Sequence, residues 1–247
     1  MLKLMKYEFR KQLFSKLAIA GILILLEIYF FYGLLADNGD AMGTSAGLLG
    51  ALTFVAILYV SFECIFTFNN DLKTKQSYML FMTPQSTYSI MGAKILSAIL
   101  QIILVALVFG AVVAADVFAI IAKNGNVKDF LELCQQFIQA VFELEVDAGT
   151  VVIVLAEILV EWMLLVILGM FSITLSTTFM ANSKARGVVS FVIFIALNVV
   201  LSKVSNLFVD GLITEVKDLA MILVLYAVIT VVTYIATAWM LEKKVSV

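Results

Sequence analysis

The amino-acid sequence predicts an all-α membrane protein with six transmembrane helices, and its composition is the first reason. Of the 247 residues, 63% are hydrophobic and only 14% are charged, whereas a soluble domain is about half apolar and a quarter charged. The second reason is that the apolar residues gather in six runs, each close to the roughly 20 residues that cross a bilayer. The third is that the chain has only one proline and 13 glycines, which leaves little sequence for linkers. We therefore expect one transmembrane domain over residues 1–247.

The six apolar runs define where the spans are expected. Because the chain crosses the membrane an even number of times, both termini are expected on the same side. The third span ends near Asp116 or one turn later. The expected spans cover residues 17–36, 46–68, 94–116, 149–177, 187–202 and 219–240.

The first 16 residues predict a helix that lies in the membrane interface. Their apolar side chains recur at helical spacing and form a stripe flanked by cations, which bind anionic head groups. The apolar run that follows continues to Leu35, which is too long for the apolar region of a signal peptide, so we expect no cleavage. The stripe consists of Leu2, Met5, Phe9 and Leu13, and the flanking cations are Lys3, Lys6 and Arg10.

The lysines and arginines predict the orientation, because these residues accumulate in cytoplasmic loops. Placing both termini in the cytosol puts twelve of the sixteen cations there. The sequence therefore predicts an N-in, C-in arrangement. In this arrangement Cys64 and Cys134 fall on opposite sides, so no disulfide joins them. The cations left outside are Lys123, Lys128, Lys203 and Lys217.

A long outer segment, residues 117–148, predicts an extracellular amphipathic helix between the third and fourth spans. Seven apolar side chains from Val127 to Val141 follow helical spacing. Acids and glutamines occupy the opposite face, which disfavours binding to anionic lipid. Two roles stay open for this segment: a cap over the outer ends of the spans, and a mobile gate or lid.

The inner loop at residues 69–93 predicts a short cytosolic helix between the second and third spans. Asn69, Asn70 and Asp71 are favourable N-cap residues, whereas Thr83 before Pro84 is pushed out of the helical region and ends the helix. Ser86 or Thr87 could cap the next helix. The mixture of aromatic, methionine and charged side chains suits a groove on a soluble partner, although a helix resting on lipid has the same pattern. The candidate contact residues are Asp71, Lys73, Lys75, Tyr78, Met79, Phe81 and Met82.

Carboxylates within the spans are the other candidate functional groups, because an ionised acid in the hydrocarbon core costs about 3 kcal/mol. A structural role, with each acid neutral or hydrogen-bonded to a neighbouring helix, stays open. The functional alternative is a pathway that favours a cationic amphipathic substrate, or an ion-coupled site in a secondary transporter. The candidate pathway residues are Glu27, Glu157 and Glu161, and Glu63 lies nearer the cytosol.

The sequence disfavours an enzymatic function for this chain. It contains no histidine, the usual general base near neutral pH and the commonest metal ligand. No P-loop motif is present, and no soluble region is long enough to form an ATPase. If ATP drives this protein, another chain hydrolyses it.

Two segments carry a resemblance to a known family. The basic amphipathic helix at Met1–Lys16 and the inner loop, from Asp71-Leu72-Lys73 through Thr83-Pro84 to Gly92-Ala93-Lys94, resemble the permease subunits of bacterial type-2 ABC transporters. The similarity is greatest to short permeases that are encoded apart from their ATPase. The order of elements agrees over the whole chain, while the local motif covers about a tenth of it.

The resemblance implies a multi-pass protein of the bacterial cell membrane, with an elbow helix over residues 1–16 and a coupling helix in the loop at 69–93. The coupling helix would dock in a cleft of an ATP-binding subunit, present in two copies that bind ATP and Mg. Two permeases, identical or paralogous, would enclose one pathway, with no cofactor on this chain. The resemblance implies export, and an amphipathic or antimicrobial peptide is the expected substrate. The large outer insertion follows the third span rather than the fifth, so the family's gate is not assigned to residues 127–145.

Overall fold

The computed structural model describes residues 2–73, 86–124, 148–179, 185–209 and 216–243. Within these ranges the chain forms helices and no strand. This confirms the predicted all-α class. The helices are α1 (Leu2–Lys11), α2 (Leu13–Leu35), α3 (Gly39–Lys73), α5 (Thr87–Asn124), α7 (Ala148–Phe179), α8 (Arg186–Phe208) and α9 (Val216–Lys243).

Six of the helices, all except α1, are long and apolar enough to cross a membrane. Each coincides with one expected span, which confirms a multi-pass membrane protein. Most of these helices extend beyond the expected bounds. A run of apolar residues marks only the part of a helix that lies in hydrocarbon, whereas backbone hydrogen bonding continues into the flanking polar residues.

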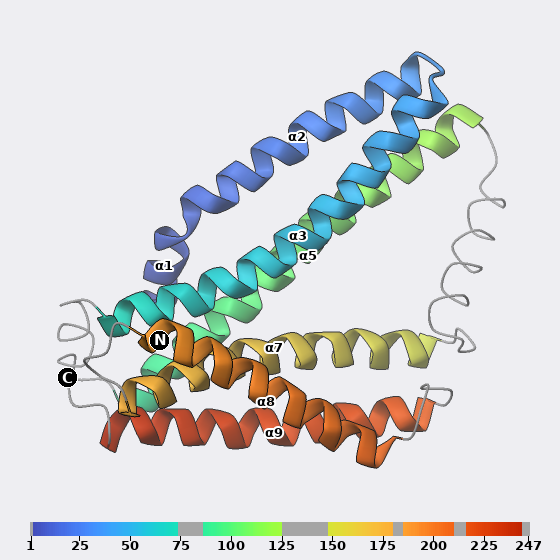
Figure 1. Cartoon of the computed structure of the whole chain (residues 1–247). Coiled ribbons are helices and arrows are strands. Elements are labelled where there is room, and N and C mark those ends of the chain that lie inside the picture. The colour runs from blue at the N-terminus through green and yellow to red at the C-terminus, as the bar shows by residue number, and fades with distance from the viewer. Residues whose placement is uncertain (1, 74–85, 125–147, 180–184, 210–215, 244–247) are drawn as a thin grey trace.

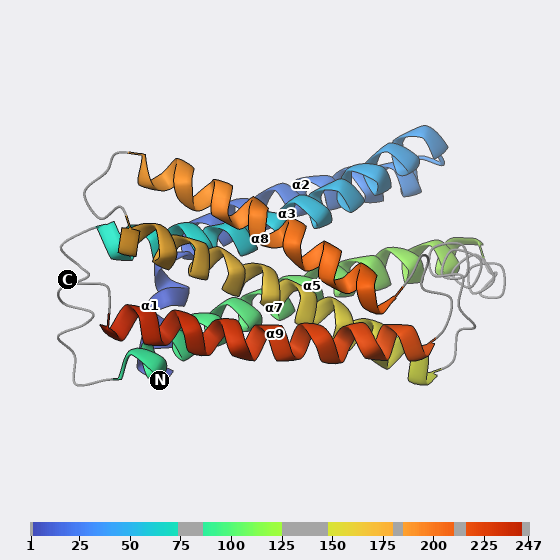
Figure 2. The same cartoon turned by 60° about the horizontal axis from the view of Figure 1, so that its bottom comes forward.

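The six long helices form two arms that meet at one end of the molecule (Figure 1). Helices α2, α3 and α5 make one arm, and α7, α8 and α9 make the other. The described ends nearest the two termini lie at the joined end, as Figure 2 also shows. The arms diverge toward the end that carries the turn between α2 and α3. Chain direction therefore alternates between the two ends, as six crossings require.

A buried apolar core joins the two arms. Ile65 and Phe68 of α3 and Met91 of α5 pack in this core against residues of α7 and α9, with Ile167 of α7 only 1% exposed. A second core lies within the first arm, around Val60. Glycine allows the close contact between α3 and α7, because a Cβ atom on Gly169 would lie 2.5 Å from the side chain of Ile65. The arms are thus held by contacts near their joined ends.

A tight turn connects α2 to α3. Asp37 has a φ of 51°, a left-handed conformation that aspartate tolerates better than most residues. The amide of Asn38 donates to the Gly33 carbonyl at 3.0 Å, and its side-chain oxygen accepts from the Ala41 amide at 3.2 Å. Lys123 of α5 donates to Asp37 and to the backbone carbonyl of Leu34. The end of α5 is therefore attached to this turn.

The inner loop departs from the prediction at its first residues. Helix α3 runs from Gly39 to Lys73, so Asn69, Asn70 and Asp71 lie inside it and do not cap a new helix. That part of the prediction is wrong, because these polar residues continue a helix whose backbone hydrogen bonds are already formed. Ser86 is confirmed as the cap of α5, since its hydroxyl accepts from the Ser89 amide at 3.2 Å. Residues 74–85, which hold most of the predicted coupling helix, lie outside the described residues.

The outer segment also begins later than predicted. Helix α5 continues to Asn124, so residues 117–124 extend the third span instead of starting an insertion. The apolar sequence from Val117 to Ala122 contains no helix breaker, which explains the continuation. The predicted helix within residues 127–145 lies outside the described part of the chain.

Helix α1 is present, and part of the face that it turns toward the rest of the protein is polar. Met5, Glu8 and Gln12 are buried against the rest of the protein, while Leu13 is 49% exposed. Gln12 separates α1 from α2 with a non-helical φ of −105° and ψ of 11°. The helix packs chiefly on α5. Glu8 and Gln12 thus form much of the face that packs on the protein, because both find buried partners, and the interfacial position of the apolar stripe stays a prediction.

Candidate functional site

Four charged residues meet where α1, α3 and α5 come together, and we call them the base cluster: Glu8, Lys11, Asp71 and Lys94. The Lys94 ammonium donates to Glu8 Oε1 at 2.6 Å and to Asp71 Oδ2 at 2.5 Å. The other carboxylate oxygen of Asp71 accepts from Lys11. Asp71 and Lys94 lie on either side of residues 74–85. The cluster therefore joins the two flanks of the inner loop to each other and to α1.

The base cluster is buried and carries no net charge. The side chains of Lys94, Asp71 and Glu8 are 5%, 9% and 10% exposed, and that of Lys11 is 29% exposed. A buried charge is costly unless it is paired and hydrogen-bonded. Each member here has an oppositely charged partner, so the cluster can persist inside the protein while fixing the relative positions of three helices.

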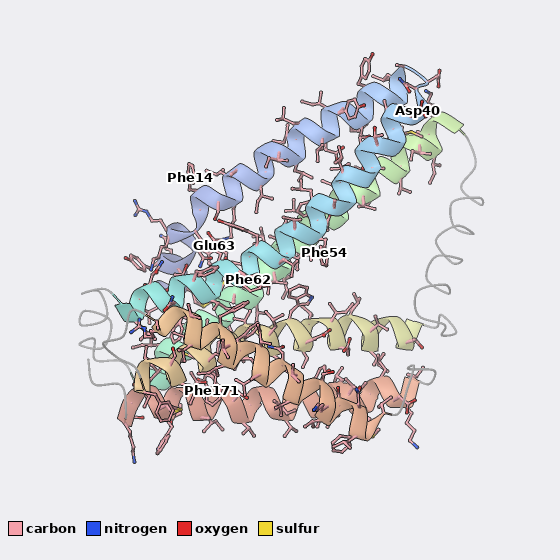
Figure 3. All side chains as sticks on the ribbon, viewed as in Figure 1. Phe14, Asp40, Phe54, Phe62, Glu63 and Phe171 are labelled. Carbon is pink, nitrogen blue, oxygen red and sulfur yellow. The ribbon has the colours of Figure 1, made fainter. Side chains whose placement is uncertain are left out.

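Further polar contacts attach the junction of α1 and α2 to α3. Gln12 Nε2 donates to the Thr67 hydroxyl at 3.2 Å. Ser15 donates to the Glu63 carboxylate, and Lys16 pairs with Glu63 Oε2 at 3.3 Å. Figure 3 shows Glu63 on the side of α3 that faces this junction. Both oxygens of the Glu63 carboxylate therefore have partners within the chain.

A small internal cavity of about 10 Å³ borders the base cluster. One wall is Gln101, whose Nε2 donates to the Ser97 hydroxyl at 3.0 Å. Gln101 Oε1 is buried and accepts no hydrogen bond from the described residues. The space is about that of one water molecule, and water is the usual partner of such a group. Polar contacts thus extend from the base cluster into α5.

The structure describes only two of the seven predicted contact residues of the inner loop, Asp71 and Lys73. Asp71 belongs to the base cluster, where its carboxylate is directed into the protein, and Lys73 is the last residue of α3. The docking role of all seven residues stays a prediction. The remaining five, Lys75, Tyr78, Met79, Phe81 and Met82, lie outside the described residues.

The three acids predicted to line a pathway are not brought together. Glu27 lies on α2 in one arm, whereas Glu157 and Glu161 lie on α7 in the other. Glu157 is half-buried and Glu161 is exposed, one helical turn apart. Their spacing of four residues places both on one face of α7.

Glu27 lies instead near Asp116 of α5, an acid that was expected at the end of the third span. The carboxyl groups of Glu27 and Asp116 are close enough to influence each other electrostatically. Glu27 Oε2 and Asp116 Oδ1 are buried and have no hydrogen-bond partner among the described residues. We call these two residues the acid pair.

Sequence reasoning missed Glu8, Lys94 and Asp116 as functional candidates. Glu8 is the only acid among the first 16 residues, which was a usable signal for an ion pair with a distant lysine. The apolar residues after Asp116 were a signal that this acid lies within a span. No group of three or more histidine, cysteine, aspartate or glutamate side chains in the described ranges could hold a metal ion.

Comparison of the chain with known protein families, with curated proteins and with solved structures finds no match.

Proposed function

We propose that this chain is the permease subunit of a bacterial type-2 ABC exporter whose ATPase is a separate protein. The observation that carries the proposal is the base cluster. A loop that receives force from a soluble partner must be attached firmly to the spans that move. Here Asp71 and Lys94, which flank the inner loop, bind each other and share α1 as a third point of attachment.

In this proposal the loop within residues 74–85 docks on the ATP-binding subunit from the cytosolic side. Closure of two such subunits displaces the loop, and the base cluster transmits the displacement to α1, α3 and α5. The core around Met91 and Ile167 then transmits it to α7 and α9. The two arms change their relative positions, and access to a pathway between paired permeases switches from the cytosol to the outside. The chain contributes different stabilities of two arrangements and no covalent chemistry.

The proposal places both termini in the cytosol and α1 at the inner surface of the cell membrane. The cations of α1 support this placement, because Lys6 and Arg10 are exposed on the surface of the helix and can bind anionic head groups. The substrate in this proposal is an amphipathic peptide. ATP and Mg bind only to the partner subunit.

Co-purification tests the assignment. The tagged chain is expressed with any P-loop ATPase that is encoded at the same locus, and retention of the ATPase on the affinity resin is measured. The variant F81A/M82A changes two predicted contact residues in the loop and is expected to lose the ATPase. The matched control is F118A, which removes an exposed phenylalanine near the opposite end of the molecule and is expected to retain it.

Two results would contradict the proposal. The first is equal retention of the ATPase by the wild-type chain and F81A/M82A. The second is transport by the purified chain alone in liposomes under a proton or sodium gradient, which would favour the ion-coupled transporter that uses Glu27, Glu157 and Glu161.

A further inference from the structure

A groove of about 350 Å³ lies between the two arms, with α3 on one side, α8 on the other and α7 as its floor. Its volume falls within the range of small-molecule sites. The residues of each wall recur every three or four positions, which places them on one face of their helix. The walls consist of Phe62, Phe66 and Asn69 of α3 and Gly187, Ser190, Phe191 and Phe194 of α8.

Polar side chains gather at one end of this groove because its two walls run in opposite directions. Helix α3 ends where the arms join, and α8 begins there (Figure 1). Asn69 therefore lies at the same end of the groove as Ser190. Phe62 and Phe194 lie at the other end, about 10 Å further into the spans. The groove thus has a polar end and an aromatic end.

The polar end offers hydrogen bonds to a ligand. The Asn69 side chain is partly buried and forms no hydrogen bond to the described residues, and its amide can both donate and accept. The Ser190 hydroxyl donates to the Gly187 carbonyl at 2.8 Å, so toward a ligand it can only accept. A ligand group that both donates and accepts, such as a carboxamide, matches this end.

Among the described residues, none that lines the groove is charged. Glu63 follows Phe62 in the chain, but it pairs with Lys16 on another side of α3 (Figure 3). Arg186 precedes Gly187 and is not among the lining residues. Because a charge without a partner is costly in apolar surroundings, the groove favours a neutral ligand.

We propose that this groove binds a neutral aromatic molecule that carries an amide at one end. Its rings pack against the four phenylalanines of the walls, since aromatic pairs are stabilising beyond the area that they bury. Its amide binds Asn69 and Ser190. A lipid acyl chain could fill the aromatic end but would leave the Asn69 amide without a partner. The ligand contacts both arms, so its binding stabilises their observed arrangement.

Photolabelling with 4-benzoylbenzamide tests the inference. This neutral molecule has two rings joined by a ketone and an amide at one end. On irradiation the ketone abstracts a hydrogen atom from a nearby C–H bond, and the two resulting radicals combine. The purified chain in a non-ionic detergent is expected to be labelled saturably, with the product located by mass spectrometry on residues that line the groove. The matched anion 4-benzoylbenzoate is expected to need at least a tenfold higher concentration.

Variants test the two ends of the groove separately. G187F adds a ring where a Cβ atom would meet no atom within 4 Å, and by filling the groove it is expected to abolish saturable labelling. The matched control G110F adds a ring at an equally open position of α5, outside the groove, and is expected to be labelled like the wild type. N69L keeps the size of the side chain but removes the amide. Its half-saturation concentration is expected to rise about fivefold, which corresponds to the loss of one hydrogen bond.

Three results would each overturn the inference. They are saturable labelling of G187F, equal labelling of N69L and the wild type, and equal labelling by the amide and the carboxylate. The last two comparisons stand even if G187F does not fold. None of the measurements involves an ATPase, so the proposed function is tested independently of them.

Discussion

Asp71 and Lys94 form a buried ion pair of 2.5 Å although they are 23 positions apart in the sequence. The pair closes the base of the inner loop, because α3 ends at Lys73 and α5 begins at Thr87. Glu8 and Lys11 extend it to α1. Three helices that the sequence separates are therefore fixed to one another at a single buried position.

Replacing Lys94 by methionine should strongly destabilise the protein. Among the described residues, Lys94 alone binds both Glu8 and Asp71, and breaking a buried ion pair by K94M costs about 3–5 kcal/mol. Thermal unfolding followed by circular dichroism in detergent measures the change. The matched variant K11M removes a cation that is more exposed and leaves Lys94 in place, so it should cost about 1 kcal/mol or less. A K11M variant as unstable as K94M would contradict this view of the cluster.

The number and type of the long helices could be predicted because each span is a local feature of the sequence. A run of about 20 apolar residues needs no knowledge of the rest of the chain. Helix ends are different. Asn69 and Asp71 have the composition of a cap, yet they continue α3, and Asp71 does so with its carboxylate bound to lysines of two other helices. No local pattern contains those partners.

The candidate site was less predictable for the same reason. Glu8 and Lys94 are 86 positions apart, so their contact arises only from the packing of α1 on α5. The acid pair depends on how α2 and α5 lie beside each other and on the extension of α5 beyond Asp116. Glu27 could be found from the sequence because an acid within an apolar run is conspicuous. That Asp116 lies near it could not be predicted, because the two residues are far apart in the chain.

Gly33 should not tolerate even alanine. A Cβ atom at this position would lie 2.7 Å from the Met42 backbone nitrogen, and a backbone atom cannot move aside as a side chain can. We expect G33A to lower the stability by about 1–3 kcal/mol. The matched variant G21A lies on the same helix with no atom within 4 Å and should be neutral or slightly stabilising, since alanine favours helix by about 1 kcal/mol. Equal melting temperatures for the two variants would show that the turn packs less closely.

Ile167 should contribute more to stability than an exposed residue of the same type. It lies in the core that joins the two arms, and truncating a buried isoleucine to alanine costs about 2–5 kcal/mol. The control is I195A on α8, where the side chain is 47% exposed and the cost should be within about 0.5 kcal/mol. Unfolding in detergent measures both. If I167A is no less stable than I195A, the arms are not held by this core.

The orientation in the membrane can be read from cysteine labelling. In a C134S background, D40C lies at the exposed α2–α3 turn and K243C at the end of α9. With both termini in the cytosol, a membrane-impermeant maleimide should label D40C in intact cells and K243C only after permeabilisation. Cys64 is 6% exposed and should contribute little background. Labelling in the reverse order would mean that the termini are outside.

Dissolved salt should affect the two ends of this molecule unequally. The ion pair between Lys123 and Asp37 at the α2–α3 turn is open to solvent, with side chains that are 32% and 82% exposed. At an ionic strength of 0.15 M, mobile ions weaken exposed charge interactions beyond about 8 Å, and at 1 M beyond about 3 Å. The base cluster is largely shielded from those ions by the protein around it. A concentrated electrolyte should therefore weaken the attraction between Lys123 and Asp37 more than the ion pairs of the base cluster, while the hydrogen bond from Lys123 to the Leu34 carbonyl keeps the end of α5 at the turn.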